Sequence, residues 1–270
     1  MSHIQDQWKI DYQAASNALH DDDYAAHARR LVTLLSDEFT EVYRRNTEHP
    51  VMIEEAVMEA SYFLFDMREV LTPTEMIETH GYLLKESRIV GAYGFSTSAR
   101  TKRPSSKGFV MSNMFGGTEE TFGKSYDKGH FICHGAGGGG DWNLFPQLRA
   151  LNRGWSDEGK LYRNMEAYVA AHLGTMFFSR PIYSNGSLCP SHLEYGVLMP
   201  DRHMWCATFS NQPSESEPGY GRPSRVAMPP ELQGVPNHGR SPSVAVFRSG
   251  RGYVAGGRIK AVASNSKSRK

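Results

Sequence analysis

The segment from residue 126 to residue 166 contains the side chains in this chain that best fit a hydrolytic reaction. It reads YDKGHFICHGAGGGGDWNLFPQLRALNRGWSDEGKLYRNME and holds a histidine, an asparagine and a glutamate with basic residues between them. A glycine-rich loop followed by a helix can fold such a stretch so that these side chains converge. Together they are the groups that a phosphodiesterase with one metal ion requires.

Hydrolysis of a phosphodiester needs an activated water and a counter-charge for the phosphoryl group. A neutral imidazole can accept a proton from water near physiological pH, so His130 is the candidate general base. A divalent cation polarises the phosphoryl oxygen and stabilises the leaving oxygen. Because Mg²⁺ retains several waters and needs few protein oxygens, the Asn152 carbonyl can be its one direct ligand, and Mn²⁺ is a substitute ion.

A loosely held metal ion needs carboxylates that orient its bound waters. Glu166 is the candidate, with Glu158 as the alternative. Apolar residues recur at helical spacing around Glu166 and place it at the edge of a buried stripe. These residues are Leu161, Met165, Tyr168, Val169, His172 and Leu173. Gly174 is expected to end this helix, which we predict to begin near residue 160.

The order of these groups resembles that of the non-specific DNA/RNA endonucleases of the His-Me finger (ββα-metal) superfamily. The resemblance covers roughly residues 88–213 and is strongest in 127–166. The matching residues are Asp127, Gly129, His130, Asn143, Pro146, Gln147, Asn152, Gly154, Trp155 and Glu166. The resemblance implies an α+β fold with a ββα-metal core, a base on a β element and a metal ligand near the following helix. It also implies cleavage of DNA, with RNA as a further substrate, to 5′-phosphates with little base specificity.

Two features of this chain depart from the family pattern. Lys128 stands where the family usually has arginine, and lysine supplies charge to a phosphate without the bidentate fork. The interval from Asn152 to Glu166 is longer than usual in the family, so residues 156–161 are interpreted as an insertion. Arg153 and Arg163 are further candidates for phosphate contact. Asp127 directly precedes the turn that presents His130 and is expected to orient the motif.

Two other patterns in the chain suggest binding sites that we do not favour. The glycines at 135–140 lack the GK[ST] sequence of a phosphate-binding P-loop, so we predict a flexible loop that allows close approach to a substrate. A zinc-like C-x2-H and H-x2-C spacing involves Cys189, His192, His203 and Cys206. A hairpin turn at Pro200 and Asp201 would place the two cysteines roughly 20 Å apart, which argues against a shared zinc ion.

The net charge of +1 conceals a strong asymmetry along the chain. Residues 1–87 carry seven basic and seventeen acidic side chains, whereas residues 221–270 carry ten basic and one acidic. The basic end suits phosphate binding, which weakens with salt, whereas the acidic end would repel nucleic acid. No secretory signal begins the sequence, so we predict a cytoplasmic protein with reduced thiols, or a toxin exported without a cleaved signal.

The acidic residues 1–87 are predicted to form a helical module for oligomerisation, partner binding or regulation. Apolar spacing predicts a first helix over residues 21–46, a second over 52–70 and a third over 74–86. A helical layer packed on the nuclease domain is the alternative interpretation.

Residues 88–213 are predicted to form the nuclease domain, with strands at 87–97, 176–183, 193–199 and 203–209. Asn185 and Gly186 predict a turn. Residues 214–270 form a basic extension rich in Pro, Gly and Ser, in which residues 243–262 predict a β-hairpin.

Such a nuclease would be lethal in its own cytoplasm, so we expect a restrained effector. Anti-phage defence and interbacterial toxicity, the latter with an immunity protein, are the two settings that fit. The N-terminal helices are the expected site for a regulatory partner or for a second copy. Two alternatives remain: a catalytically degenerate nucleic-acid-binding or scaffold protein, and a site-specific nicking enzyme with the same motif.

Overall fold

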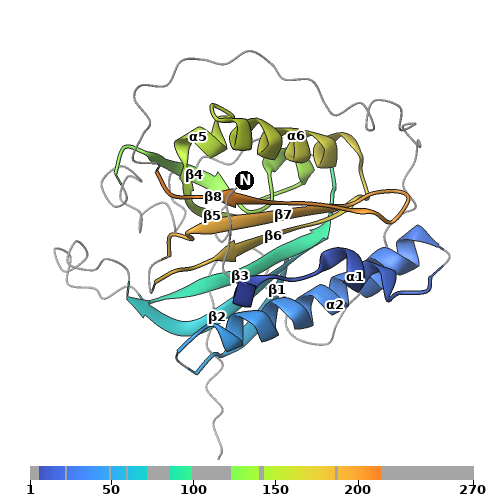
Figure 1. Ribbon diagram of the computed structural model, residues 1–270, viewed down its shortest axis with the longest axis horizontal. Helices are drawn as coiled ribbons and strands as arrows, with labels where there is room; N and C mark the ends of the chain where they lie inside the picture. Colours follow the sequence, from blue (N-terminus) through green and yellow to red (C-terminus); the bar gives the residue numbers. More distant parts are fainter. Residues whose placement is uncertain are drawn as a thin grey trace, which may run out of the picture.

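The centre of the computed structural model is a six-stranded sheet in which every neighbouring pair is antiparallel (Figure 1). The structure describes residues 6–21, 23–48, 50–58, 60–71, 85–98, 123–139, 143–185 and 188–213. The strand order is β1-β2-β3-β6-β7-β8. The strands are β1 (Ile53–Met58), β2 (Ser61–Leu71), β3 (Lys85–Phe95), β6 (Met176–Ile182), β7 (His192–Leu198) and β8 (Met204–Ser210).

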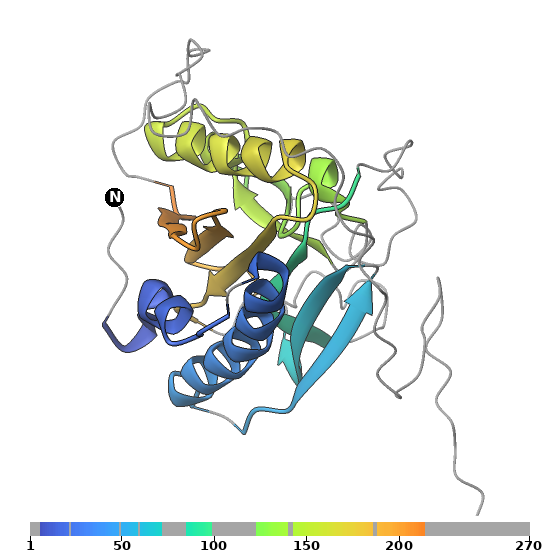
Figure 2. The same cartoon turned by 90° about the vertical axis from the view of Figure 1, so that its right-hand side faces the viewer.

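Both faces of this sheet are covered (Figures 1 and 2). One face carries the short 3-10 helix η1 (Asp6–Trp8), α1 (Tyr12–Asn17) and α2 (Tyr24–Arg45). The other face carries the hairpin of β4 (Tyr126–His130) and β5 (Leu144–Leu148), with η4 (His134–Ala136), α5 (Arg149–Asn152) and α6 (Asp157–Ala171). A separate apolar core fills the space on each side. The predicted α+β class is therefore confirmed.

Helix α2 confirms the first predicted helix. The Asp23 side chain caps its start by accepting a hydrogen bond from the Ala26 amide at 2.9 Å. Leu31, Leu35 and Phe39 recur along one face of the helix and are fully buried against the sheet. The helix begins where a capping side chain is available, and its single apolar stripe explains why periodicity predicted it.

The predicted second helix over residues 52–70 is wrong, because residues 53–58 form β1 and residues 61–70 belong to β2, and the two strands pair antiparallel. Phe63 and Leu64 are consecutive and both buried, since they enter the cores on opposite faces of the sheet. Burial on both faces removes the alternation that marks a strand, so the pattern imitates a helix. The strands β1 and β2 thus belong to one sheet with β6 to β8.

Other predicted elements can be located in the same way. Of the predicted third helix, residues 74–84 lie outside the described residues and residues 85–86 begin β3. The predicted boundary at residues 87 and 88 falls inside β3. The strands predicted at 87–97, 176–183, 193–199 and 203–209 are confirmed as β3, β6, β7 and β8. Gly186 of the predicted turn and the basic extension from residue 214 lie outside the described residues.

The β7–β8 hairpin turns at Pro200 and Asp201, as predicted, and the Met199 amide donates to the His203 carbonyl at 2.9 Å. Cys206 pairs with Gly196. Within the described parts of the chain, no helix combines the length and apolar character needed to cross a membrane.

A buried ion pair fastens the N-terminal segment to the sheet. Arg180 on β6 is 2 % exposed and donates to the Glu194 carboxylate on β7, with Nε at 2.7 Å. The Tyr12 hydroxyl of α1 donates to the same carboxylate, and Arg180 Nη2 donates to the Trp8 carbonyl at 2.5 Å. Because the guanidinium and carboxylate satisfy one another and the backbone, the first helix is held on the sheet without unpaired charge.

Replacing Arg180 with Met removes the partner of Glu194 and leaves a buried carboxylate unpaired. We expect the free energy of unfolding to fall by about 3–5 kcal/mol, the usual cost of breaking a buried ion pair. Urea unfolding followed by circular dichroism measures this loss. The control is Arg44→Met, because the exposed Arg44–Glu41 pair at 3.6 Å should contribute only about 0–1 kcal/mol. Similar small losses in both variants would contradict the prediction.

Candidate functional site

The β4–β5 hairpin presents the first half of the sequence motif. In its register Asp127 lies opposite Gln147, and His130 lies opposite Leu144. Gly129 occupies the strand between them, and a Cβ atom there would overlap Gln147 Oε1 and Cβ. Glycine is therefore required because the Gln147 side chain folds across the hairpin at this point. This close approach brings the two halves of the motif together.

Asn143 closes the loop between the two strands and is fully buried. Its carbonyl oxygen accepts from the Phe131 amide at 3.0 Å, and its side chain pairs with both backbone groups of Ile132 at 2.7 Å. The amide nitrogen also donates to the Gly139 carbonyl at 3.0 Å. Asn143 therefore has a structural role in the motif: it holds the chain directly after His130.

The described part of the glycine run is compactly folded against the protein itself. Residues 134–136 form η4, and Gly137 adopts a φ of 92°, which favours glycine. A Cβ atom on Gly138 would overlap the Ile132 carbonyl, and one on Gly137 would overlap the Thr97 hydroxyl. The close approach that the glycines at 135, 137 and 138 allow is to neighbouring protein atoms.

Asp127 is the centre of a polar network that joins β4 to α5. Its carboxylate accepts from Arg149 Nε at 3.1 Å, from Arg153 Nε at 2.6 Å and Nη2 at 2.9 Å, and from Asn152 Nδ2 at 3.3 Å. Partial burial disfavours the charged carboxylate, but the hydrogen bonds from Arg153, Arg149 and Asn152 outweigh it and lower the pKa of Asp127. The carboxylate is therefore ionised and positions the side chains of Arg149 and Asn152 on α5 and of Arg153 directly after it.

Asn152, the predicted metal ligand, lies at the end of α5 and is half-buried. Its amide nitrogen donates to Asp127, so the opposite end of the side chain, the carbonyl oxygen, is the end left for a cation. A hard cation such as Mg²⁺ prefers this type of oxygen. One oxygen of this type is therefore available at the end of α5.

Glu166, the predicted orienting carboxylate, lies on α6 and is only 7 % exposed. Arg163, one turn earlier, donates to Glu166 Oε2 at 2.8 Å. Burial raises the pKa of the Cys133 thiol to about 12, and the negative charge of Glu166 contributes to the same shift. Glu166 therefore lies close to the chain that follows His130, on the inner side of α6.

Tyr162 connects the helix of Glu166 to the strand of His130. Its ring is buried against Tyr195 and Phe209, and its hydroxyl donates to the His130 carbonyl at 3.4 Å. His130 is itself half-buried at the end of β4. The predicted base and the predicted carboxylate are thus held on adjacent, directly bonded elements.

The start of α6 explains the long interval between Asn152 and Glu166. The helix begins at Asp157, because the Ser156 side chain caps it by accepting from the Gly159 amide at 3.0 Å. The residues interpreted as an insertion therefore include the cap and the first turn of the helix. Glu158 in that turn accepts from the Ser210 amide of β8 at 3.1 Å. The Glu158 carboxylate is bonded to the edge strand of the sheet. Glu166 is therefore the better candidate for the carboxylate that orients metal-bound water.

The three predicted phosphate-binding residues occupy different environments. Arg153 is exposed, lies 5.0 Å above the Trp155 ring and is bonded to Asp127. Arg163 has 56 % of its side chain exposed and bonds Glu166. Lys128 is half-buried on β4. The structure thus brings Arg153 together with Asp127 and Asn152, and it brings Arg163 together with Glu166.

Sequence reasoning missed two residues that hold this site together. Arg149 donates to Asp127 from one turn before Arg153. The four-residue spacing of these arginines in the sequence indicates that they are neighbours on one helix face. Asn211, beyond β8, is fully buried and bonds the Leu148 amide at 2.7 Å and the Pro146 carbonyl at 2.9 Å. No local sequence pattern indicates the contacts of Asn211, because they join residues that are far apart in the chain.

The zinc-like spacing does not produce a cluster of ligands. Cys189 is half-buried, and its thiol lies 3.8 Å from the Pro146 carbonyl. In the described ranges, no group of three or more His, Cys, Asp or Glu side chains could hold a metal ion. An ion held by one Asn carbonyl and by water does not depend on such a group.

No protein-family model matches the chain, and no curated protein sequence is significantly similar to it.

The change Asp127→Asn should reveal how much the network around this carboxylate stabilises the protein. The change keeps the shape but removes the charge, so we expect the free energy of unfolding at pH 7 to fall by about 1–3 kcal/mol. The folded pKa lies below the unfolded value of about 3.9, so the contribution is complete above that value and is lost as the pH falls through the folded pKa.

Urea unfolding of both proteins from pH 7 to pH 3 tests this expectation. The difference between them should stay constant down to about pH 5 and shrink below it. Asp157→Asn is the control, because Asp157 pairs with Lys160 on the surface and should change stability little at any pH. A difference that grew towards low pH would refute the assignment.

Proposed function

We propose that the protein is a metal-dependent endonuclease that hydrolyses phosphodiester bonds of DNA, with RNA as a further substrate. The observation that carries this proposal is the hydrogen bond from Asn152 to the ionised Asp127, which turns the Asn152 carbonyl away from its neighbour. A single amide oxygen directed in this way is a suitable direct ligand for one Mg²⁺ ion. The hairpin β4–β5 followed by α6 would then be a ββα-metal core.

The other predicted groups have places consistent with this chemistry. Asn152 would hold the ion, and Glu166 would orient its bound water from α6. When bound, the ion would supply charge for the phosphoryl oxygen and for the leaving oxygen. His130 would take the proton of the attacking water, and its strand is fixed by the Tyr162 hydroxyl and by Asn143.

Charge around this site would favour a phosphate backbone without reading bases. Lys128 and Arg163 would contact phosphate oxygens, with the charge of Arg163 shared with Glu166 as that of Arg153 is shared with Asp127. We propose a restrained effector of anti-phage defence or an interbacterial toxin, because an unrestrained nuclease of low specificity would destroy its host. A regulatory or immunity protein, or a second copy, would bind on the side that carries α1 and α2.

The first test is loss of nuclease activity on replacing the proposed base. We expect His130→Ala to lower the rate of supercoiled plasmid cleavage in Mg²⁺ by about 10²–10⁴-fold, the usual contribution of a general base. Chelator should abolish cleavage by the wild type, and Mn²⁺ should restore it. His192→Ala on β7 is the control and should keep the wild-type rate. Unchanged cleavage by His130→Ala would refute the assignment, whereas DNA binding without cleavage would favour a degenerate binding protein.

The second test separates the two glutamates of α6. We expect Glu166→Gln to lower the cleavage rate by about 10–100-fold, as is usual when a group that orients a metal ligand is removed. Raising the Mg²⁺ concentration should recover part of the loss. Glu158→Gln should leave the rate nearly unchanged, because Glu158 contacts the edge of β8. The reverse order of effects would show that Glu158 is the functional carboxylate.

A further inference from the structure

The two outer strands of the six-stranded sheet differ in how their edges are satisfied. The strand β1 forms one edge and β8 forms the other. In an edge strand, alternate residues direct their backbone N–H and C=O groups to the neighbouring strand, and the residues between them direct theirs outward. Such an outward row pairs readily with a further strand, so folded proteins usually close it or protect it.

The edge of β1 is open within the described ranges, where β2 is its only neighbouring strand. The Met67 amide of β2 donates to the Met52 carbonyl, directly before β1, at 2.8 Å. Because backbone groups alternate in direction along a strand, those of Ile53, Glu55 and Val57 point outward. Three residues thus offer N–H and C=O groups to an additional strand.

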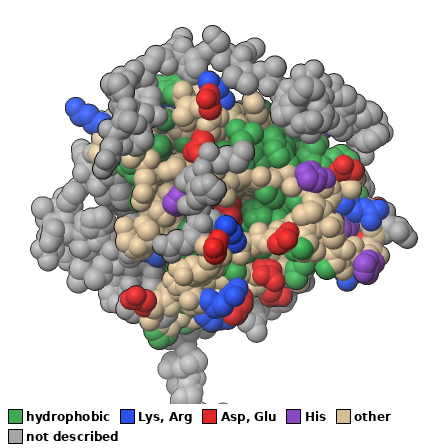
Figure 3. Space-filling view, viewed as in Figure 1, with side chains coloured by type: hydrophobic (Ala, Val, Ile, Leu, Met, Phe, Trp, Pro, Cys, Tyr) green, Lys and Arg blue, Asp and Glu red, His purple; other side chains and the backbone are tan. Residues whose placement is uncertain are grey.

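The side chains along this edge are apolar or acidic and lie in solvent. Met52 is 58 % exposed and Val57 is 49 % exposed, and they are two of the three exposed large apolar side chains among the described residues. Glu54 and Glu55 are exposed on opposite faces of β1, and within the described residues neither forms an ion pair. Acidic side chains are also prominent over the part of the molecule that carries α1 and α2 (Figure 3). A segment that suits this edge is therefore apolar and basic.

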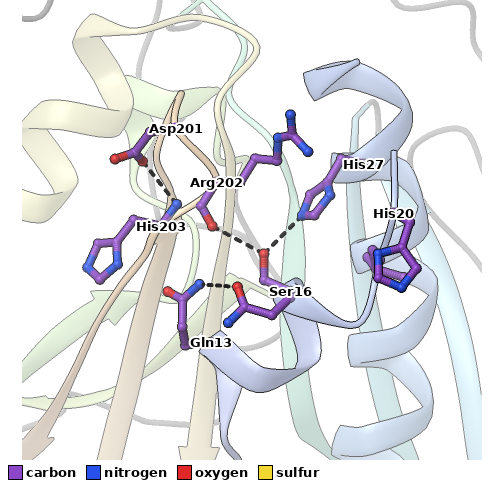
Figure 4. A pocket seen from close by; sticks show the side chains of 9 residues that line it. Gln13, Ser16, His20, His27, Asp201, Arg202 and His203 are labelled. Carbon is purple, nitrogen blue, oxygen red and sulfur yellow. Dashed lines mark hydrogen bonds between the residues drawn. The ribbon is translucent and has the colours of Figure 1, made fainter. Parts of the chain in front are cut away.

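The outward edge of β8, in contrast, is closed by side chains at both ends. Gln13 and Ser16 of α1 lie beside the β7–β8 turn (Figure 4), and the Met204 amide donates to Gln13 Oε1 at 2.8 Å. At the other end, the Ser210 amide donates to the Glu158 carboxylate of α6 at 3.1 Å. Helices on both faces of the sheet thus protect β8, and β1 is the edge at which a further strand can add.

The same chain contains a segment of matching character near its C-terminus, outside the described residues. Residues 243–248 read SVAVFR, in which valine and phenylalanine favour strands and the last residue is basic. This segment is as long as β1, which has 6 residues. It belongs to the part of the chain, residues 221–270, that carries ten basic and one acidic side chain. The connection over residues 214–242 can span roughly 100 Å when extended, more than the roughly 30 Å width of six strands.

We propose that residues 243–248 pair with the open edge of β1 in the same chain, as an additional strand of the sheet. Backbone hydrogen bonds to the outward groups of β1 supply the affinity, as when an extended peptide adds to a sheet edge. The apolar side chains of the segment cover those exposed at β1, and its basic charge offsets Glu54 and Glu55. A second copy suits this edge less well, because pairing β1 with itself brings the glutamates of two chains together.

Residue-resolved amide hydrogen exchange of the full-length protein tests this pairing. We expect the three outward amides of β1 to exchange at least about tenfold more slowly in the wild type than in Val246→Pro, because proline removes a donor and interrupts a strand. The inward amides of β1 donate to β2 and should exchange alike in both proteins. Ser266→Pro places proline beyond the pairing segment, so its exchange should match that of the wild type.

A second pair of variants tests the contribution of charge. Arg248→Glu should speed exchange of the outward amides by about threefold or more, because glutamate then faces the carboxylates of β1. Lys267→Glu makes the same change of charge outside the segment and should leave these rates unchanged. Equal effects of the two variants would show that only the overall charge matters and would contradict pairing by residues 243–248.

Equal exchange of the outward amides in the wild type and in Val246→Pro would overturn the proposal. Fast exchange in both proteins would mean that the edge stays open, and slow exchange in both would mean that another segment covers it. Protection that falls on dilution would assign the edge to a second copy and would overturn the proposal as well. Because no metal ion or nucleic acid is added, the result does not depend on whether the His130 site is a nuclease.

Discussion

Burial of both faces of the central sheet is the constraint on which the rest of this structure depends. On β6 the consecutive residues Phe177 and Phe178 are both fully buried, one in each apolar core. Removing a phenylalanine side chain from water contributes about 1.5–3 kcal/mol, so neither face could be left open without a large loss. The helices α1 and α2 and the layer of α6 are therefore equally necessary, although only the α6 layer carries the candidate nuclease site.

The same constraint explains where glycine is needed in the strands. A Cβ atom on Gly196 would overlap the Phe178 ring, and one on Gly91 would approach Phe39 to 2.6 Å. Glycine at these positions lets the aromatic side chains of the α2 core lie directly on the sheet. In the β4–β5 hairpin on the opposite face, the lack of a side chain on Gly129 likewise leaves room for the Gln147 side chain. Close packing thus extends from the core into the candidate site.

The sequence located the helices α2 and α6 and the strands β3, β6, β7 and β8, although both faces of the sheet are buried, but it did not locate β1 and β2. Helices α2 and α6 each have one apolar stripe, so helical spacing located both, with α6 starting three residues earlier than predicted. The strand β2 has Phe63 and Leu64 in opposite cores, and the segment that contains the apolar run at residues 62–65 was mistaken for a helix. His130, Asn152 and Glu166 were selected from motif order, and their roles stay predictions. Their supports, Tyr162 and Asn211, depend on long-range contacts that local patterns do not encode.

The network around Asp127 also decides how charge is distributed at the candidate site. Arg149 and Arg153 both bond this carboxylate, so one negative charge offsets much of the attraction that two arginines would exert on a phosphate. Glu166 offsets Arg163 in the same way on α6. Each of these arginines is therefore held in place by a carboxylate. The negative charge of that carboxylate weakens the attraction of the arginine for a distant phosphate. Such an arrangement favours fixed geometry at one phosphate over broad electrostatic capture, since a paired guanidinium keeps its position but projects little net field.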